Sequence, residues 1–308
     1  MKNHFTFYFI LFLVVTVNSQ SLLSAQDDYL SLSKKSVDLY QQGKSKEAVA
    51  YAKKALSFAE KRFGPEHGET ASMLSNLAEL YQVLGKLTEA APVCKRALKI
   101  REKVLGPDNP YTASSLNRLA EIYNGQGKYA DAEPLYKRAL KIYEKSFGPY
   151  DPNTTMSLNN LAELYREQGK YTDAEPLYIR ALISPDSPYT SMYLNNLAVN
   201  YREQGKYAEA EHFFKRALVF YERFLGPDHP DSVASLNNLA GLYESQGKYN
   251  DAEPLYKRAL KIKENTFGPN HPDVAKILEK LSVLYKKLNR KVEADKCMKR
   301  AHAIGAKK

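Results

Sequence analysis

The chain has 308 residues, of which 44% are hydrophobic and 26% are charged, and its formal net charge is +10. These proportions are ordinary for a folded protein. They exclude a long disordered linker, because the 15 Gly and 15 Pro fall mostly at repeated turn positions. The basic balance raises the question of a nucleic-acid partner.

An apolar segment near the N-terminus differs from the rest of the sequence. Residues 1–4 contain one Lys, and the stretch FTFYFILFLVVTV at residues 5–17 is almost wholly apolar. It is shorter than the roughly 20 residues that a helix needs to span a bilayer. The polar stretch NSQSLLSA follows, and Ser19 and Ala25 are small residues suited to cleavage. We therefore predict that residues 1–25 are a signal peptide, with an uncleaved membrane anchor or a buried element as the alternatives.

One pattern, LNNLAELYREQGKYTDAEPLYIRAL at residues 158–182, returns along the rest of the chain. A turn glycine marks its period at residues 43, 85, 127, 169, 205 and 247, and Asn289 takes the seventh place. The spacing is 42 residues, except for 36 residues between positions 169 and 205. A period of this size is typical of a repeat array. The sequence therefore predicts seven units stacked in one dimension.

Each unit predicts two helices joined at the turn glycine. Apolar residues recur at i, i+3, i+4 and i+7, the spacing of one helix face. Gly169 suits a left-handed helix end, Thr172 or Asp173 suits a helix start, and Pro176 fits within the first turn. The two apolar stripes of this unit are Leu158, Leu161, Ala162 and Tyr165, followed by Ala174, Tyr178, Ala181 and Leu182.

This pattern resembles the tetratricopeptide repeat. Leu, Leu-Ala and Tyr in the first helix, Gly at the turn, and Ala, Tyr and Ala-Leu in the second helix carry the resemblance. The 42-residue period and the connector FGPxHP, at residues 63–67, 225–230 and 267–272, are similar to the longer subtype found in kinesin light chains. The resemblance covers residues 28 to about 302. It implies an all-α fold, a right-handed superhelical solenoid of about seven antiparallel helix pairs.

We assign the solenoid to residues 26–302 and a short basic tail to residues 303–308. Two segments depart from the repeat. In the first unit, at residues 36–40, the Tyr stands one position late, and residues 183–189 lack six residues of the pattern. We expect the second helix and the connector at that deletion to be short. The polar first unit and the Lys- and Arg-rich last unit have the character of capping repeats.

The histidines and carboxylates give no sign of catalysis. His67, His229 and His271 occupy the same connector position in different units, so we expect a turn role for them. Glu121 and Glu163 also match each other one repeat apart, which argues against an acid–base pair. The sequence contains no phosphate loop, nucleophile elbow or metal-binding spacing. We therefore predict a protein without enzyme activity, catalytic residues, cofactor or metal.

Lys-Arg pairs recur in the predicted second helices. Second helices line the outer, convex side in the family that the pattern resembles. A nucleic-acid site would combine a basic stripe with stacking aromatic rings, whereas most Tyr residues here stand at core spacing. We interpret the pairs as a solvated helix face and predict no nucleic-acid partner. The pairs are Lys95-Arg96, Lys137-Arg138, Lys215-Arg216, Lys257-Arg258 and Lys299-Arg300.

A polar stripe lies one helical step from the core stripe of the first helices. The resemblance implies that first helices line a concave groove, so this stripe should face a partner. Asn side chains can pair with a peptide backbone, and Arg166 and Arg202 would favour acidic groups. Replacing Asn159 and Asn195 should then hardly affect folding. The candidate groove residues are Asn117, Glu121, Asn124, Asn159, Glu163, Arg166, Asn195, Arg202, Asn237 and Glu244.

The alternative for this stripe is that its Asn side chains bond one another or the next helix. We expect that behaviour of the adjacent Asn160, Asn196 and Asn238.

These features together predict an exported, periplasmic or secreted scaffold or adaptor that binds a protein or peptide segment in the groove. The alternatives are an exported accessory subunit of a cell-envelope or secretion assembly, and a repeat array that associates with itself. A membrane contact is expected only if the N-terminal segment stays uncleaved.

Overall fold

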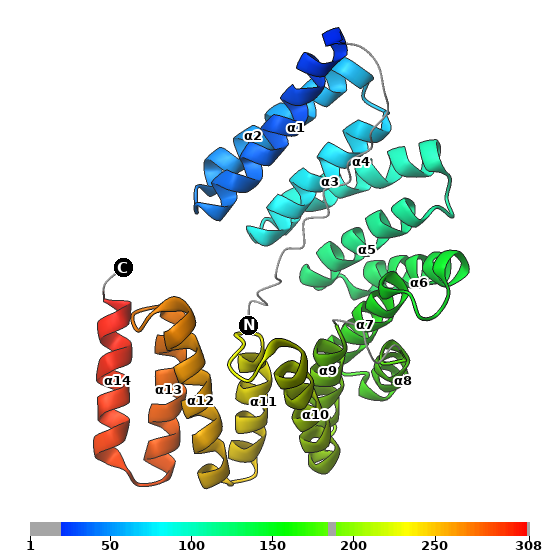
Figure 1. Ribbon diagram of the computed structural model, residues 1–308. Coiled ribbons are helices and arrows are strands. Elements are labelled where there is room, and N and C mark those ends of the chain that lie inside the picture. The colour runs from blue at the N-terminus through cyan, green and yellow to red at the C-terminus, as the bar shows by residue number, and fades with distance from the viewer. Residues whose placement is uncertain (1–19, 184–188, 307–308) are drawn as a thin grey trace. The chain divides into compact units, whose positions relative to one another are not determined.

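The computed structural model describes residues 20–183 and 189–306, and all regular structure in this part of the chain is helical. Fourteen helices form seven antiparallel hairpins, as the repeat pattern predicts (Figure 1). Odd-numbered helices are the first helices of the hairpins and even-numbered helices are the second helices. The helices are α1 (Gln20–Gln41), α2 (Ser45–Phe63), α3 (Gly68–Val83), α4 (Leu87–Leu105), α5 (Pro110–Gly125), α6 (Tyr129–Phe147), α7 (Pro152–Glu167), α8 (Tyr171–Ala181), α9 (Thr190–Glu203), α10 (Tyr207–Leu225), α11 (Ser232–Ser245), α12 (Tyr249–Phe267), α13 (Pro272–Lys287) and α14 (Lys291–Gly305).

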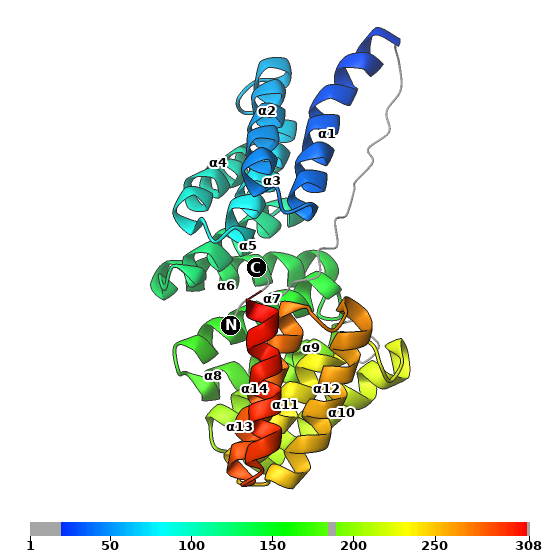
Figure 2. The same cartoon turned by 90° about the vertical axis from the view of Figure 1, so that its left-hand side faces the viewer.

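The chain divides into two compact units. Unit 1 ends at Gly106 and holds α1 to α4, and unit 2 begins at Pro107 and holds α5 to α14. Within each unit a second helix packs against its own first helix and against the first helix of the next repeat. Figures 1 and 2 both show the hairpin partners α1 and α2 side by side, and likewise α13 and α14.

The predicted leader lies mostly outside the described residues, which begin at Gln20. At the other end, α14 continues to Gly305, three residues beyond the limit we assign to the solenoid. None of the described helices combines the length and apolar character that crossing a membrane requires.

The hairpin turns use a left-handed residue at the end of each first helix. Gly169 has φ of +74°, and Asn289, in the same place of the last repeat, has φ of +59°. The Lys170 amide donates to the Tyr165 carbonyl at 2.8 Å, and the Gly169 amide donates to the Arg166 carbonyl at 2.9 Å. This pair of bonds is the Schellman motif, which satisfies the last carbonyls of the helix. The prediction that Asn289 substitutes for Gly is confirmed.

The core follows the two predicted stripes. Ala162 and Ala174 have no exposed surface, which lets α7 and α8 approach closely, and Tyr178 is fully buried beside them. Leu158 and Leu161 are also buried, whereas Tyr165 and Leu182 are partly buried at the edge of the core. Small residues at the helix crossing and large residues beside it therefore form an interlocking core that continues from one repeat into the next.

The helix at the deletion is short, as the sequence predicts. α8 has 11 residues, whereas α6 and α10, its counterparts in the neighbouring repeats, have 19 residues each. The missing residues would have formed the C-terminal turns of α8 and the connector that follows.

The connectors cap the first helices with their side chains. His67 Nδ1 accepts from the Glu69 amide at 3.2 Å, and Asp151 Oδ1 accepts from the Asn153 amide at 2.8 Å. His271 Nδ1 accepts from the Asp273 amide at 3.2 Å, and its ring stacks on Phe267 with a centroid distance of 4.7 Å. These bonds satisfy one amide that the start of a helix leaves without an intrahelical acceptor. The predicted turn role of the connector histidines is confirmed.

Replacing His271 by Ala should lower the free energy of unfolding by about 1 kcal/mol, because α13 loses its capping acceptor. His271→Asn should retain most of that stability, since Asn caps the equivalent helix α5 through Asn109. Urea denaturation followed by circular dichroism measures both variants. An equal loss in the two variants would show that the ring stacking, and not the cap, stabilises this connector.

Candidate functional site

The first helices of unit 2 approach one another more closely than its second helices do. Contacts join α5 to α7, α7 to α9 and α9 to α11. Short side chains are enough to bridge them: Asn117 Nδ2 donates to Ser157 Oγ at 2.7 Å, and Asn195 Nδ2 donates to Ser235 Oγ at 2.6 Å. Links between second helices instead use long Arg–Glu pairs. The first helices therefore lie on the inner side of unit 2.

Most of the Asn side chains on this face connect one repeat to the next. Besides the two Asn–Ser bonds, Asn196 Nδ2 donates to Asn159 Oδ1 at 2.9 Å, and Asn160 Nδ2 donates to Glu121 Oε1 at 3.2 Å. Asn159 and Asn195 are only 5% and 6% exposed. Stacking therefore buries both side chains, which contradicts the exposure on which the expected lack of effect on folding depends. These Asn side chains instead follow the alternative prediction, in which they form hydrogen bonds to the neighbouring first helix.

The bracing leaves part of the hydrogen-bonding capacity of the row unused. Among the residues that the structure describes, four carboxamide oxygens on this face are buried and accept no hydrogen bond. A buried acceptor without a donor costs free energy. A hydrogen bond from a donor to any of these oxygens would therefore be stabilising. The four oxygens belong to Asn117, Asn124, Asn195 and Asn237.

Three side chains form an ordered charged group on α7 and α8. Arg166 pairs with Glu163 at 2.7 Å, and the Tyr178 hydroxyl donates to the other Glu163 oxygen at 2.6 Å. Burial raises the pKa of Tyr178 well above its usual value, and the adjacent Glu163 adds to the effect. Burial lowers the pKa of Arg166, but the hydrogen bond and charge of Glu163, with a smaller contribution from Tyr178, together outweigh burial and raise this pKa. Glu163 thus accepts hydrogen bonds from both Arg166 and Tyr178.

A second charged group joins three first helices near the C-terminal end of the array. Glu244 accepts from the Tyr256 hydroxyl at 2.6 Å, and Lys280 Nζ lies 5.5 Å from the centre of the same ring. Burial lowers the pKa of Lys280, Glu244 counteracts the decrease, and Arg202 adds to it. Arg202 itself pairs with Glu203 at 2.9 Å. The predicted residues Arg202 and Glu244 are therefore brought into one neighbourhood.

Lys280 was missed in the sequence because it does not stand on the predicted stripe. It takes the position that Asn160, Asn196 and Asn238 hold in earlier repeats. A Lys where four of the other repeats have Asn was the signal that could have identified it.

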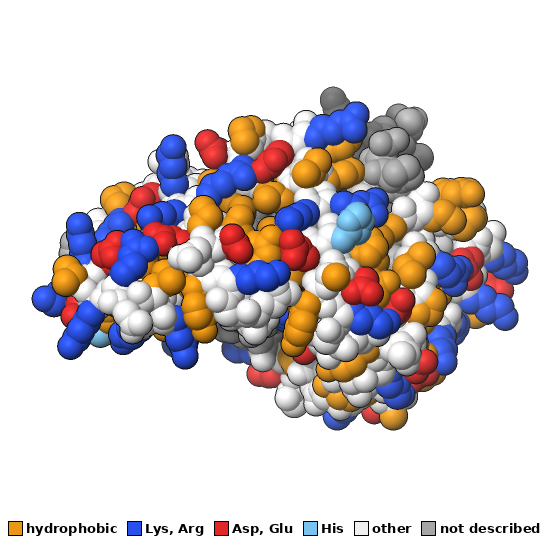
Figure 3. All heavy atoms as spheres, turned by 90° about the horizontal axis from the view of Figure 1, so that it is seen from below, with side chains coloured by type: hydrophobic (Ala, Val, Ile, Leu, Met, Phe, Trp, Pro, Cys, Tyr) orange, Lys and Arg blue, Asp and Glu red, His pale blue; other side chains and the backbone are white. Residues whose placement is uncertain are grey.

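Arginines of three Lys-Arg pairs, and Arg180 of α8, link a second helix to the previous one. Arg96 pairs with Glu60 at 2.5 Å and donates to the Pro65 carbonyl at 3.1 Å. On the face shown in Figure 3, Lys and Arg side chains are interspersed with Asp and Glu instead of forming one basic block. These arginines thus have a structural role in stacking. The same Arg–Glu link at 2.5 Å joins Arg180 to Glu144, Arg258 to Glu222 and Arg300 to Glu264.

The carboxylates of the stripe are held by hydrogen bonds to neighbouring side chains. Glu121 and Glu163 each hold a hydrogen bond to a neighbouring side chain, Asn160 and Tyr178 respectively. Within residues 20–183 and 189–306, no three His, Cys, Asp or Glu side chains gather closely enough to hold a metal ion. What the geometry supports is recognition by charge and hydrogen bonding.

Solved structures share this arrangement of helices. A Podosopora anserina protein described as a kinesin light chain with nearly identical TPR-like repeats is 24% identical, with a TM-score of 0.57, over 65% of this chain and 97% of that chain. A tetratricopeptide repeat protein from Parabacteroides merdae is 21% identical, with a TM-score of 0.59, over 91% and 94% of the two chains. PilW, a type IV pilus biogenesis factor, is 20% identical, with a TM-score of 0.57, over 76% and 92%. At these identities the likeness shows the fold.

Family models assign the repeats directly. Two models described as tetratricopeptide repeat match residues 30–69, 69–145, 111–182, 189–265 and 235–307. No match was found among curated proteins. The matched segments cover nearly all of the described residues and coincide with the helical hairpins. The chain therefore belongs to the tetratricopeptide repeat family.

Proposed function

We propose that the protein is a non-enzymatic scaffold or adaptor that binds a segment of another protein along the first-helix face of unit 2. Proteins of this family bind other proteins or peptides. The observation that carries the proposal is the row of ordered, partly exposed charged side chains on that face. Glu163 and Arg166 are each 24% exposed, and Arg202 is 28% exposed. Preorganised polar groups of this kind bind with little loss of side-chain entropy.

The Asn side chains and the charged side chains on this face have different roles. The Asn residues mainly brace neighbouring first helices, so they hold the face in shape. The charged residues Glu121, Glu163, Arg166, Arg202 and Glu244, joined by Lys280, are the groups that meet the partner. Arg202 and Lys280 lie close enough to affect each other, and together they favour an acidic group.

Two alternatives keep the same binding face and change the partner. An accessory subunit of a cell-envelope or secretion assembly is compatible with the fold shared with the pilus biogenesis factor PilW. A self-associating array would place a second copy of the chain on the face. Export to the periplasm or outside the cell is part of the proposal, and it is supported by the apolar residues 5–17 followed by small polar residues.

Photo-crosslinking in the native host tests the binding face and captures the partner in the same step. Arg202 is replaced by p-benzoylphenylalanine in one variant, and the exposed Lys261 of α12 is replaced in a matched control. We expect at least tenfold more adduct from position 202. An adduct with another protein supports a scaffold or subunit, and mass spectrometry of the adduct distinguishes the two. An adduct with a second copy supports self-association, and adducts from position 261 alone would contradict the proposed face.

The bracing role predicts a loss of stability. Asn195→Ala leaves the buried Ser235 hydroxyl without its donor, so the free energy of unfolding should fall by about 1–3 kcal/mol. The matched control is Asn250→Ala, at an exposed position of α12, which should change stability by less than about 0.5 kcal/mol. Urea denaturation compares the two. If they were equally stable, Asn195 would be available for binding after all.

Export predicts a processed N-terminus. Intact-mass measurement of the protein from its native host should show a chain that starts between residues 19 and 26. A chain that retains Met1 in a cytoplasmic fraction would overturn the proposed localisation.

A further inference from the structure

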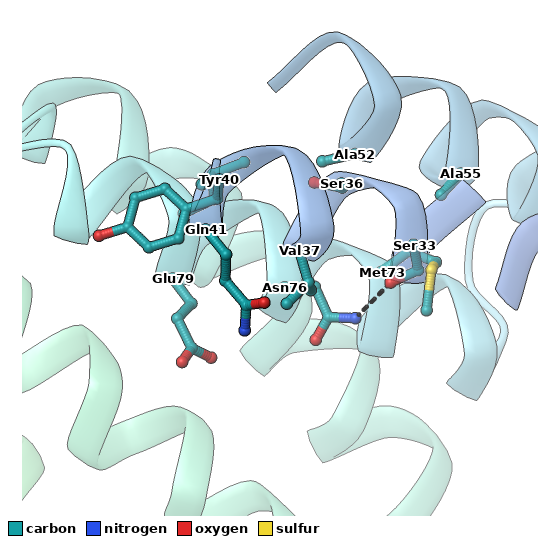
Figure 4. Close-up of a pocket in the computed structure, with 11 residues that line it drawn as sticks. Ser33, Ser36, Val37, Tyr40, Gln41, Ala52, Ala55, Met73, Asn76 and Glu79 are labelled. Carbon is teal, nitrogen blue, oxygen red and sulfur yellow. Dashed lines mark hydrogen bonds between the residues drawn. The ribbon is translucent and has the colours of Figure 1, made fainter. Parts of the chain in front are cut away.

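Unit 1 contains a pocket of about 130 Å³ between α1, α2 and α3. Its floor is formed by small and apolar side chains, among them Ala52, Ala55 and Met73 (Figure 4). Gln41 and Glu79 extend their polar ends to the same side of the pocket in that view. The pocket therefore combines an apolar interior with a polar rim.

The pocket exists because one small residue replaces a large one. Ala52 stands nine residues after its turn glycine, and the same position holds an aromatic ring in four later repeats, Cys94 in the second repeat and Met298 in the last. These rings are at most 2% exposed, so each fills the space between its own first helix and the next. In the first repeat Ala52 leaves that space open. The equivalent aromatic residues are Tyr136, Tyr178, Phe214 and Tyr256.

The pocket lies on the surface that corresponds to the binding face of unit 2. Ser33, Val37 and Tyr40 of α1 line it, and they hold the repeat positions that Asn117, Glu121 and Asn124 hold in α5. A segment that follows the first helices in unit 1 would thus pass over its mouth.

The chain itself shows which group fits such a space. In four repeats the occupant is the ring of Tyr or Phe, and an engineered cavity of about 150 Å³ holds one benzene ring. Met73 adds a polarisable thioether, which makes favourable contacts with aromatic rings. One aromatic side chain therefore matches the interior in size and chemistry.

The rim selects among aromatic groups. In the third and fourth hairpins, the Tyr136 and Tyr178 hydroxyls lie near Glu121 and Glu163 of the first helices, and Tyr178 donates to Glu163 at 2.6 Å. In the first repeat this position is Val37. The carboxylate at the pocket is Glu79 of the following first helix α3, which stands to Ala52 as Glu163 stands to Tyr136. A carboxylate there is a strong acceptor for a phenol hydroxyl.

We propose that this pocket binds a tyrosine side chain presented by the partner protein. The assignment rests on the proposed binding of protein segments and identifies a residue that the bound segment carries. A single buried aromatic anchor of this kind commonly contributes a large share of the binding energy at a protein interface.

The test uses p-cresol, the side-chain analogue of tyrosine, and the methyl resonances of labelled methionine. The chain has five Met residues, and Met73 lines the pocket. We expect a saturable shift of the Met73 methyl at millimolar p-cresol, whereas the Met192 methyl in unit 2 stays unchanged. Toluene lacks the hydroxyl and should bind about tenfold more weakly, and Glu79→Gln should reduce that preference.

The variant Ala52→Tyr fills the pocket with an aromatic ring of the chain itself. It should abolish the Met73 shift while preserving the fold, because Tyr is the native residue at this position in three other repeats. Ala52→Leu fills the pocket in part and should weaken p-cresol binding at least tenfold, so it decides the question if the Tyr variant fails to fold.

A Met73 shift that is absent from the unaltered protein, or that persists in both Ala52 variants, would overturn the proposal. Because p-cresol binding needs no partner, this outcome is independent of the crosslinking at position 202. A positive p-cresol result beside adducts from position 261 alone would preserve the pocket and reject the binding face proposed for unit 2.

Discussion

The close approach of the two helices in each hairpin is the constraint on which the rest of the molecule depends. At the crossing the side chains are reduced to Ala with no exposed surface, such as Ala162 and Ala174. The terminal hairpins show how near the backbones come. There Ser36 Oγ donates to the Ala48 carbonyl and Ser282 Oγ donates to the Ala294 carbonyl, both at 2.8 Å. A larger residue at the crossing would separate the helices and open the core beside it.

Hydrogen bonds and ion pairs join each repeat to its nearest neighbour. The hydroxyl of Tyr165 donates to Glu133 of the preceding second helix at 3.0 Å, and Tyr243 donates to Glu211 in the same way at 3.0 Å. The Arg–Glu pairs and the Asn–Ser bonds also span one repeat. Stability in such an array is approximately a sum of hairpin and interface contributions. The Asn side chains are largely used for these interfaces, so the face proposed for binding rests on the charged residues of the first helices.

The sequence predicts the fold well because helix period, turn glycine and connector are local signals repeated seven times. The left-handed Asn289 and the short α8 follow from the same alignment. The candidate site is predicted only in part. Whether Asn195 faces a ligand or the next helix depends on Ser235 coming within 2.6 Å through stacking, and no local pattern encodes that distance.

Two further features, one on the second helices and one in the first repeat, also depend on distances between repeats that the sequence does not encode. From the sequence alone, the Lys-Arg pairs look like free positive charge on the surface. In the structure, stacking places Glu60 next to Arg96. The space left by Ala52 also becomes visible only when the repeats are superimposed on a structure, because a buried Ala is ordinary in a helix.

The short helix α8 has a consequence for how the array comes apart. Its N-terminal half is firmly joined to the following hairpin, since Tyr201 donates to Glu175 at 3.0 Å and Asn200 donates to the Tyr171 carbonyl at 3.0 Å. The C-terminal turns that would complete the interface are missing, so less apolar surface is buried at this junction than at the others. In an array of repeats joined to their neighbours, cooperative unfolding is interrupted at the junction that buries the least surface. Local opening in unit 2 should therefore begin between α8 and α9, and the hairpins on either side should exchange their amide hydrogens as separate blocks.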